Sequence, residues 1–167
     1  MIGNIKIIAV CMCKVYDERN YRIIRALNNF AVENDYRLFV YHTCSDLYWK
    51  TLSEKGEQSV FDLIDYNITD AVVTFEEGVY AENVMTKNRM DAAKYGKPVI
   101  SVGVEHDDCI SIKFGYAKGF EQVVRHVIEQ HGVRDIGFIA GRKDEENSEE
   151  RIAVFRKLLE EYDIPFR

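Results

Sequence analysis

Arg151 is the residue whose type and position best fit ligand binding in this sequence. The apolar segment 136–140 predicts a buried strand, and a polar loop follows it. Ser148 is a good N-cap for the next helix, which places Arg151 one turn into that helix, beside the carboxyl end of the strand. Ligands bind at that end in open α/β sheets, and a guanidinium offers paired donors and a fixed charge. The competing interpretation is a surface arginine that pairs with Glu149 or Glu150.

A second set of candidates follows the first three predicted strands. Because such loops lie at the carboxyl ends of parallel strands, their aromatic rings could stack on a sugar or purine, and their carboxylates could accept hydroxyl protons. Taken singly, each residue is better explained as ordinary loop surface, but as a set the loops are expected to line a site. The ligand-binding candidates are Tyr16, Asp17, Thr43, Asp46, Phe75 and Glu76.

Motifs for catalysis or metal binding are missing. The four cysteines and four histidines form no C-x-x-C or H-E-x-x-H spacing, so buried reduced cysteines and scattered polar histidines are expected. His126 and His131 fit the C-terminal end of a helix, where positive charge is favourable. There is no G-x-S-x-G elbow, Walker loop or G-x-G-x-x-G after the first strand. We predict no catalytic residue, no metal and no cofactor.

Composition predicts a soluble globular protein. The 167 residues are 47% hydrophobic and 30% charged, with a formal net charge of −6. This charge argues against a general nucleic-acid or anionic-membrane surface. No apolar run approaches the ~20 residues that span a bilayer, and the N-terminus lacks the features of a signal peptide. We therefore expect a cytoplasmic protein without a membrane partner.

Strand and helix patterns alternate along the chain. This alternation favours an α/β fold with a doubly wound parallel sheet. Strands are predicted at 5–12, 37–43, 71–75, 98–102 and 109–114, and helices at 20–34, 57–67, 82–95, across 120–128 with a stop at Gly132, and from Ser148.

The stretch 115–151 resembles the ligand-binding domain of the lac-repressor/purine-repressor (LacI/GalR) family, which has the type 1 periplasmic-binding-protein fold. The matching residues are 126–132 (HVIEQHG), 133–141 (VRDIGFIAG) and Ser148-x-x-Arg151. The His-Gly form of the turn is more similar to the branch fused to GGDEF-type diguanylate cyclases. The overall resemblance extends over nearly the whole chain.

The resemblance implies a sheet of order 2-1-3-4-5. It makes residues 1–115 the first lobe of a two-lobed domain and residues 116–167 the incomplete start of the second, with the strand at 136–140 outside the first sheet. It also implies that Arg151 contacts ligand. One departure is that Gly115-Tyr116 stands where the repressors usually carry an Asp-Asn pair, which argues against a sugar-type ligand.

The leading interpretation is a sensor of a small-molecule effector, a sugar, nucleoside or similar, that binds between two lobes and changes an attached output by population shift. A C-terminal diguanylate cyclase is the preferred output, because only a few residues precede the first strand and no DNA-binding domain fits there. Direct nucleic-acid contact is therefore not expected from these residues. The alternatives are the effector-binding domain of a LacI-type transcriptional regulator, a stand-alone flavodoxin-like domain, or a dimerisation module.

A homodimer is also expected. A chain that ends inside the second lobe would leave the apolar faces of Phe138, Val154, Phe155 and Leu158 partly uncovered, and exposed apolar patches favour association.

Overall fold

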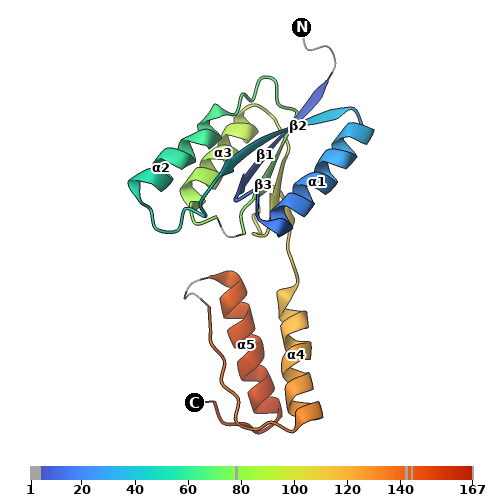
Figure 1. The fold of residues 1–167 in the computed structure, drawn as a ribbon, viewed down its shortest axis with the longest axis vertical. Coiled ribbons are helices and arrows are strands. Elements are labelled where there is room, and N and C mark those ends of the chain that lie inside the picture. Colours follow the sequence, from blue (N-terminus) through green and yellow to red (C-terminus); the bar gives the residue numbers. More distant parts are fainter. Residues whose placement is uncertain (1–4, 78, 142, 144, 167) are drawn as a thin grey trace. The chain divides into compact units, whose positions relative to one another are not determined.

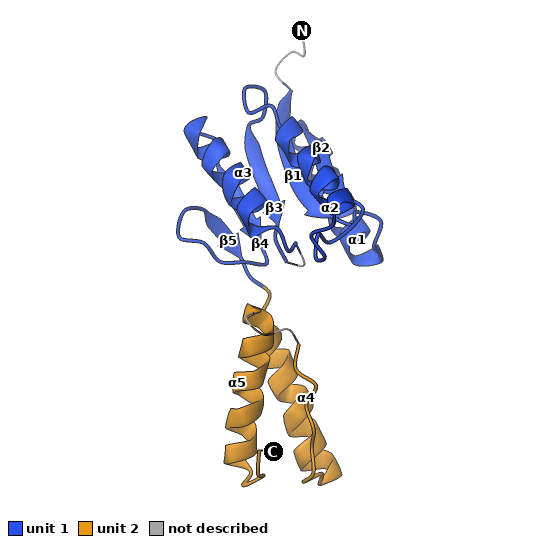
Figure 2. Ribbon diagram, turned by 90° about the vertical axis from the view of Figure 1, so that its left-hand side faces the viewer, with its two compact units in different colours: residues 1–113 blue, residues 114–167 orange. Residues whose placement is uncertain are grey.

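The computed structural model describes residues 5–77, 79–141, 143 and 145–166. The chain forms two compact units, unit 1 (Met1–Lys113) and unit 2 (Phe114–Arg167), coloured separately in Figure 2. The sequence analysis placed this division two residues later, at 115/116. No described helix combines the length and the apolar character needed to cross a bilayer.

Unit 1 contains a five-stranded parallel sheet in the order β2-β1-β3-β4-β5. This confirms the predicted fold class and strand order. The last strand is shorter than predicted, and the first and second begin within a residue of the expected positions. The strands are β1 (Lys6–Cys13), β2 (Tyr36–Thr43), β3 (Ala71–Phe75), β4 (Val99–Val102) and β5 (Ile110–Ile112).

Helices cover both faces of this sheet (Figure 1). One face packs against α2 (Leu52–Gln58), the 3-10 helix η1 (Ser59–Leu63) and α3 (Glu82–Lys94), around a core that includes Cys11, Phe61 and Met85. The opposite face, with Val10 and Val73, packs against α1 (Glu18–Glu33). Neighbouring residues of a strand therefore pack into different cores, because successive side chains of a pleated strand point to opposite faces of the sheet.

Two helix starts differ from the prediction. The helix predicted at 57–67 instead begins at Leu52, because Thr51 and Glu54 form a reciprocal capping box, and it continues as a 3-10 turn. Helix α1 begins at Glu18, two residues early, and the Asn20 side chain donates to the carbonyls of Cys13 and Lys14 instead of capping. Both differences extend a helix toward its N-terminus.

Unit 2 is built from α4 (Tyr116–His131) and α5 (Glu146–Glu161), which pack together around Ile128 and Leu158. Gly132 has φ 62°, the left-handed conformation predicted for the end of α4. Phe155 and Leu158, expected to be partly uncovered, are 3% and 1% exposed. That part of the argument for a dimer is therefore wrong, because the helices of unit 2 bury these side chains themselves.

The predicted strand at 136–140 is absent from the structure, although the segment is extended and runs alongside the helices of unit 2 (Figure 1). Ile136 and Phe138 pack on the core, whereas Ile139 is 96% exposed, so the alternation of a strand persists. A strand requires a neighbouring strand for its hydrogen bonds, and none lies beside this segment in the described part of the chain. The segment does lie outside the sheet of unit 1, as expected.

Ser148 does not cap α5. The N-cap is Glu145, and Ser148 lies inside the first turn, 2% exposed, with its Oγ donating to Glu145 Oε2 at 2.6 Å. A Cβ on Gly141 would come within 2.1 Å of the Ser148 hydroxyl, so the loop and the helix start are in close contact here. Ser148 thus packs against Gly141 and Glu145 at the start of α5.

A buried ion-pair network joins the end of β3 to α3 and β4. Glu76 and Arg89 are 7% and 6% exposed, and both carboxylate oxygens of Glu76 lie 2.9 Å from Arg89 Nη1. The same carboxylate accepts hydrogen bonds from Thr74 (2.8 Å) and Ser101 (3.3 Å) and contacts His106 Nε2 at 2.9 Å. A buried carboxylate needs such compensation for its lost hydration.

Replacement of Arg89 by leucine is expected to destabilise the protein by roughly 3–5 kcal/mol, because Glu76 would remain buried without its cation. Arg22→Leu is the matched control, since Arg22 pairs with Glu18 on the exposed face of α1 and such pairs contribute less than about 1 kcal/mol. Urea unfolding followed by circular dichroism measures both. Equal losses in the two variants would contradict the structural role of the network.

Candidate functional site

The exit loops of β1, β2 and β3 emerge at one edge of the sheet. Register pairs Cys13 with Thr43 and Cys11 with Thr74, so the parallel strands end close together. We call the loops 14–17, 44–51 and 76–81 the carboxyl edge; residue 78 is outside the described residues. Lys14, Leu47 and Lys50 in these loops have positive φ values of 49°, 62° and 54°. Such backbone conformations are costly for non-glycine residues and are often found at functional sites.

Two of the predicted ligand residues face the protein interior. Thr43 is 1% exposed, and its hydroxyl donates to the Ser45 carbonyl at 2.6 Å. Glu76 is held in the buried network with Arg89. The structure therefore gives both residues a role in shaping the loops. Glu76 faces the interior because side chains two residues apart in an extended segment point the same way. Thr74, two residues earlier, already points inward and donates a hydrogen bond to Glu76.

The other candidates of unit 1 lie nearer the surface. Tyr16 is 80% exposed and meets the His42 ring edge-on, with centroids 5.4 Å apart. Asp17 is the N-cap of α1 without a side-chain cap bond. Phe75 is half-buried and packs on the core beneath α1. Tyr16 and Asp17 are thus exposed at the carboxyl edge, whereas Phe75 packs on the core of unit 1.

Asp46 connects all three loops. Its carboxylate lies 2.9 Å from Lys14 Nζ, and its carbonyl accepts a hydrogen bond from the Tyr80 amide at 3.1 Å. The hydrogen bond from Lys14 is the main reason that the pKa of Asp46 lies below its usual value. The same contact raises the pKa of Lys14.

The loop after β2 is held by two glutamates that sequence reasoning did not select. Glu57 accepts hydrogen bonds from the amides of Cys44 (2.8 Å) and Ser45 (2.9 Å), and these bonds lower its pKa. Glu54 accepts a bond from the Trp49 amide at 3.2 Å besides forming its capping box. In the sequence, only the Thr51-x-x-Glu54 spacing, which is typical of a capping box, indicated a structural role for one of these glutamates.

An aromatic cluster at the same edge was also missed. Tyr48 packs edge-on against Trp49 (4.5 Å between centroids) and against Tyr80 (5.2 Å), and Trp49 is 76% exposed. At the same edge, Glu77 forms an ion pair of 2.7 Å with Arg19 of α1. Tyr80 lies far from Tyr48 in sequence, so only the fold brings the cluster together. Exposed indole and phenol rings suit stacking on the apolar face of a ligand.

In unit 2, the Arg151 guanidinium lies over the Tyr116 ring, 5.9 Å from its centroid, and Nε donates to the Asn147 carbonyl at 3.0 Å. Tyr116 is the residue at which the sequence departs from the repressor pattern. The Tyr116 ring stacks against the guanidinium, and the Asn147 carbonyl fixes the orientation of Nε. Arg151 is therefore positioned by two local contacts.

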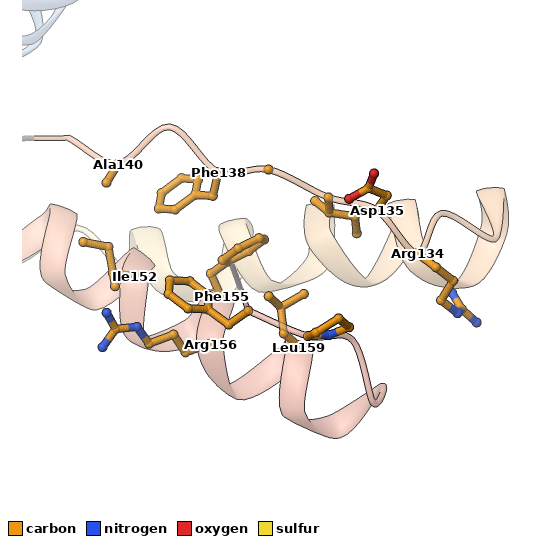
Figure 3. Close-up of a pocket in the computed structure, with 12 residues that line it drawn as sticks. Arg134, Asp135, Phe138, Ala140, Ile152, Phe155, Arg156 and Leu159 are labelled. Atoms are coloured by element: carbon orange, nitrogen blue, oxygen red, sulfur yellow. The ribbon is translucent and has the colours of Figure 1, made fainter.

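A groove of about 550 Å³ lies between α5 and the extended segment 136–140 (Figure 3). Phe138, Ile152, Phe155 and Leu159 line it, and Arg156 lies 4.9 Å from the centroid of the Phe166 ring. Arg151 is not among its lining residues. The groove runs along the extended segment 136–140, and Arg134, Asp135 and Arg156 add charged groups to its apolar lining.

Asp46→Asn is expected to reduce the loss of stability in acid. Because the folded pKa of Asp46 is lowered, its contribution is complete above the unfolded value of about 3.9 and is lost as the pH falls through the folded pKa. Urea unfolding at pH 7, 5, 4 and 3 should show the wild-type advantage shrinking toward zero at the acid end. Asp107→Asn, on an exposed loop, is the control. If the difference in unfolding free energy between wild type and Asp46→Asn stayed constant across this pH range, the stabilising role of the Lys14–Asp46 ion pair would be contradicted.

No protein-family model and no curated protein matches the sequence. The structure is similar to that of a sugar-binding transcriptional regulator of the LacI family from Enterococcus faecalis, with 15% identity, a TM-score of 0.68, and coverage of 100% of this chain and 56% of that one. The regulator CcpA of Lactococcus lactis has 20% identity and a TM-score of 0.71, with coverage of 97% and 56%.

A third neighbour is a periplasmic binding protein/LacI transcriptional regulator from Alkaliphilus metalliredigens complexed with D-xylulofuranose. It has 17% identity and a TM-score of 0.67, and the match covers 96% of this chain and 54% of that one. The chain thus spans little more than half the length of these structures. Over that length, it has the fold of LacI-family regulators and related periplasmic binding proteins.

Proposed function

We propose that this chain is the effector-binding part of a LacI-type transcriptional regulator and that its ligand is a sugar or a similar polyhydroxylated molecule. The observation that carries the proposal is the similarity over nearly the whole chain to a regulator described as sugar-binding and to one complexed with D-xylulofuranose. We give this similarity more weight than the departure from the repressor pattern at Gly115-Tyr116. This favours the regulator alternative over the preferred sequence interpretation, a sensor linked to a diguanylate cyclase. The regulator would be cytoplasmic and homodimeric, and these residues would carry no catalytic activity of their own.

The carboxyl edge of unit 1 has the chemistry for such a ligand. Tyr16 and Trp49 offer exposed rings for stacking on the C–H face of a sugar. Asp46 and Lys14 offer an acceptor and a donor for hydroxyl groups, and their ion pair keeps both side chains in place before ligand arrives. Preorganisation of this kind reduces the entropic cost of binding.

Arg151 is the proposed ligand contact of unit 2. Stacking on Tyr116 restricts the guanidinium, so less side-chain entropy is lost when it donates to a hydroxyl or carboxylate oxygen. The ligand would stabilise one conformation of the regulator over another, and only its difference in affinity for the two would drive the response.

Arg151→Ala in the complete regulator is expected to weaken ligand binding by roughly 1.5–3 kcal/mol, since a charge-assisted hydrogen bond is lost. The unliganded protein should lose roughly 1–2 kcal/mol, the contribution of a half-buried cation–π contact. Thermal unfolding is measured without ligand and with D-glucose, sucrose, D-xylulose, nucleosides and carboxylates.

Arg156→Ala is the matched control, because it removes an arginine from the same helix that stacks on Phe166. It should leave ligand-induced stabilisation unchanged. A large drop in the melting temperature of unliganded Arg151→Ala, with ligand-induced stabilisation intact, would make the arginine structural. A panel without any stabilising sugar would count against the proposed ligand class.

A further inference from the structure

Two histidines at the end of α4 face each other. The Nε2 atoms of His126 and His131 are 3.2 Å apart, and their ring centroids are 5.0 Å apart with an interplanar angle of 76°. Both residues are exposed. A hydrogen bond between them requires one Nε2 to carry a proton and the other to present its lone pair. The two rings therefore share one proton at a single point on the surface of unit 2.

This contact is unusual for residues five apart in a helix. Positions i and i+5 are separated by about 140° around a regular helix, so their side chains do not normally meet. His131 is the last residue of α4, and Gly132 ends the helix in the left-handed conformation. The contact therefore depends on the helix ending at His131, which explains why spacing rules for metal ligands did not identify the pair.

We propose that His126 and His131 form a two-imidazole binding site for a divalent transition metal such as Zn²⁺ or Ni²⁺. With metal–nitrogen distances of 2.0–2.1 Å, two nitrogens of a tetrahedral site lie about 3.3 Å apart, close to the observed separation. The metal would replace the shared proton, and water would complete its coordination. The negative end of the α4 dipole favours a cation at this position.

Neighbouring groups limit the site to two protein ligands. The Glu129 carboxylate accepts a hydrogen bond from the Tyr162 hydroxyl, and Arg134 binds the Ile128 carbonyl at 3.1 Å. Within the described residues, no group of three or more His, Cys, Asp or Glu side chains converges on one point. Binding is therefore expected to be weaker than at a structural zinc site with four ligands.

Metal binding would have two local consequences. Imidazoles bind metal in their neutral form, so affinity should fall in acid. A bound metal would also cross-link the last turn of α4 to the turn before it, which should slow amide hydrogen exchange at the C-terminal end of that helix.

The test is calorimetric titration of ZnCl₂ and NiCl₂ into the untagged, chelator-treated protein at pH 7.5. Because the exposed Cys44 thiol could bind metal, every variant carries Cys44→Ser. One saturable site per chain is expected, with NMR shifts of the imidazole C–H protons confined to His126 and His131. His126→Gln and His131→Gln should each weaken binding at least ~10-fold, as expected when one of two ligands is lost.

His42→Gln, in unit 1, is the control and should leave the titration unchanged. Three outcomes would overturn the proposal: no saturable binding at millimolar metal, unaltered binding in the His126→Gln/His131→Gln double variant, or NMR shifts at other histidines in place of these two. None of these readouts depends on sugar binding, so the metal site and the proposed effector function can fail separately.

Discussion

The buried Glu76–Arg89 ion pair fixes the place where three elements of unit 1 meet. Glu76 is the first residue after β3, and Arg89 belongs to α3. The other partners of the carboxylate are Thr74 in β3, Ser101 in β4 and His106 in the loop after β4. The Glu76 amide also donates to the Val102 carbonyl at 2.9 Å. A charge this deeply buried is tolerated only when every partner is in place, so the network selects one arrangement of these elements.

The carboxyl edge owes its shape to carboxylates that bind backbone amides and neighbouring side chains. Glu76 anchors the end of β3, Glu57 binds the amides after β2, and Glu54 caps α2 while holding Trp49. Lost backbone hydrogen bonds in these long loops are thereby replaced by side-chain acceptors. What remains at the surface is a set of aromatic rings and the Lys14–Asp46 pair. The loops can therefore present side chains to a ligand without depending on it for their conformation.

Much of the fold could be predicted from the sequence, because strand and helix periods alternate clearly and the resemblance implied the strand order. Arg151 was correctly placed about one turn into its helix, although Ser148 proved to be packed inside the first turn. Glu76 was misjudged because a residue just past a strand was treated as loop, while its register with Thr74 continued inward. The aromatic cluster of Tyr48 and Tyr80 could not be found from spacing, since only the tertiary fold joins the two loops. The strand at 136–140 needed a hydrogen-bonding neighbour that the described residues do not provide.

The extended segment 136–140, beside the groove of unit 2, favours self-association of the chain in concentrated solution. It is extended, it alternates inward and outward side chains, and Ile139 is 96% exposed on its outer face. A peptide of this kind is a template for any other extended peptide, because backbone pairing requires no matching sequence. Self-association through it would be driven by main-chain hydrogen bonds and apolar contact, and would be nearly insensitive to salt. The five residues 136–140 thus combine two roles, since Ile136 and Phe138 pack on the core of unit 2 while Ile139 offers an apolar surface to other chains.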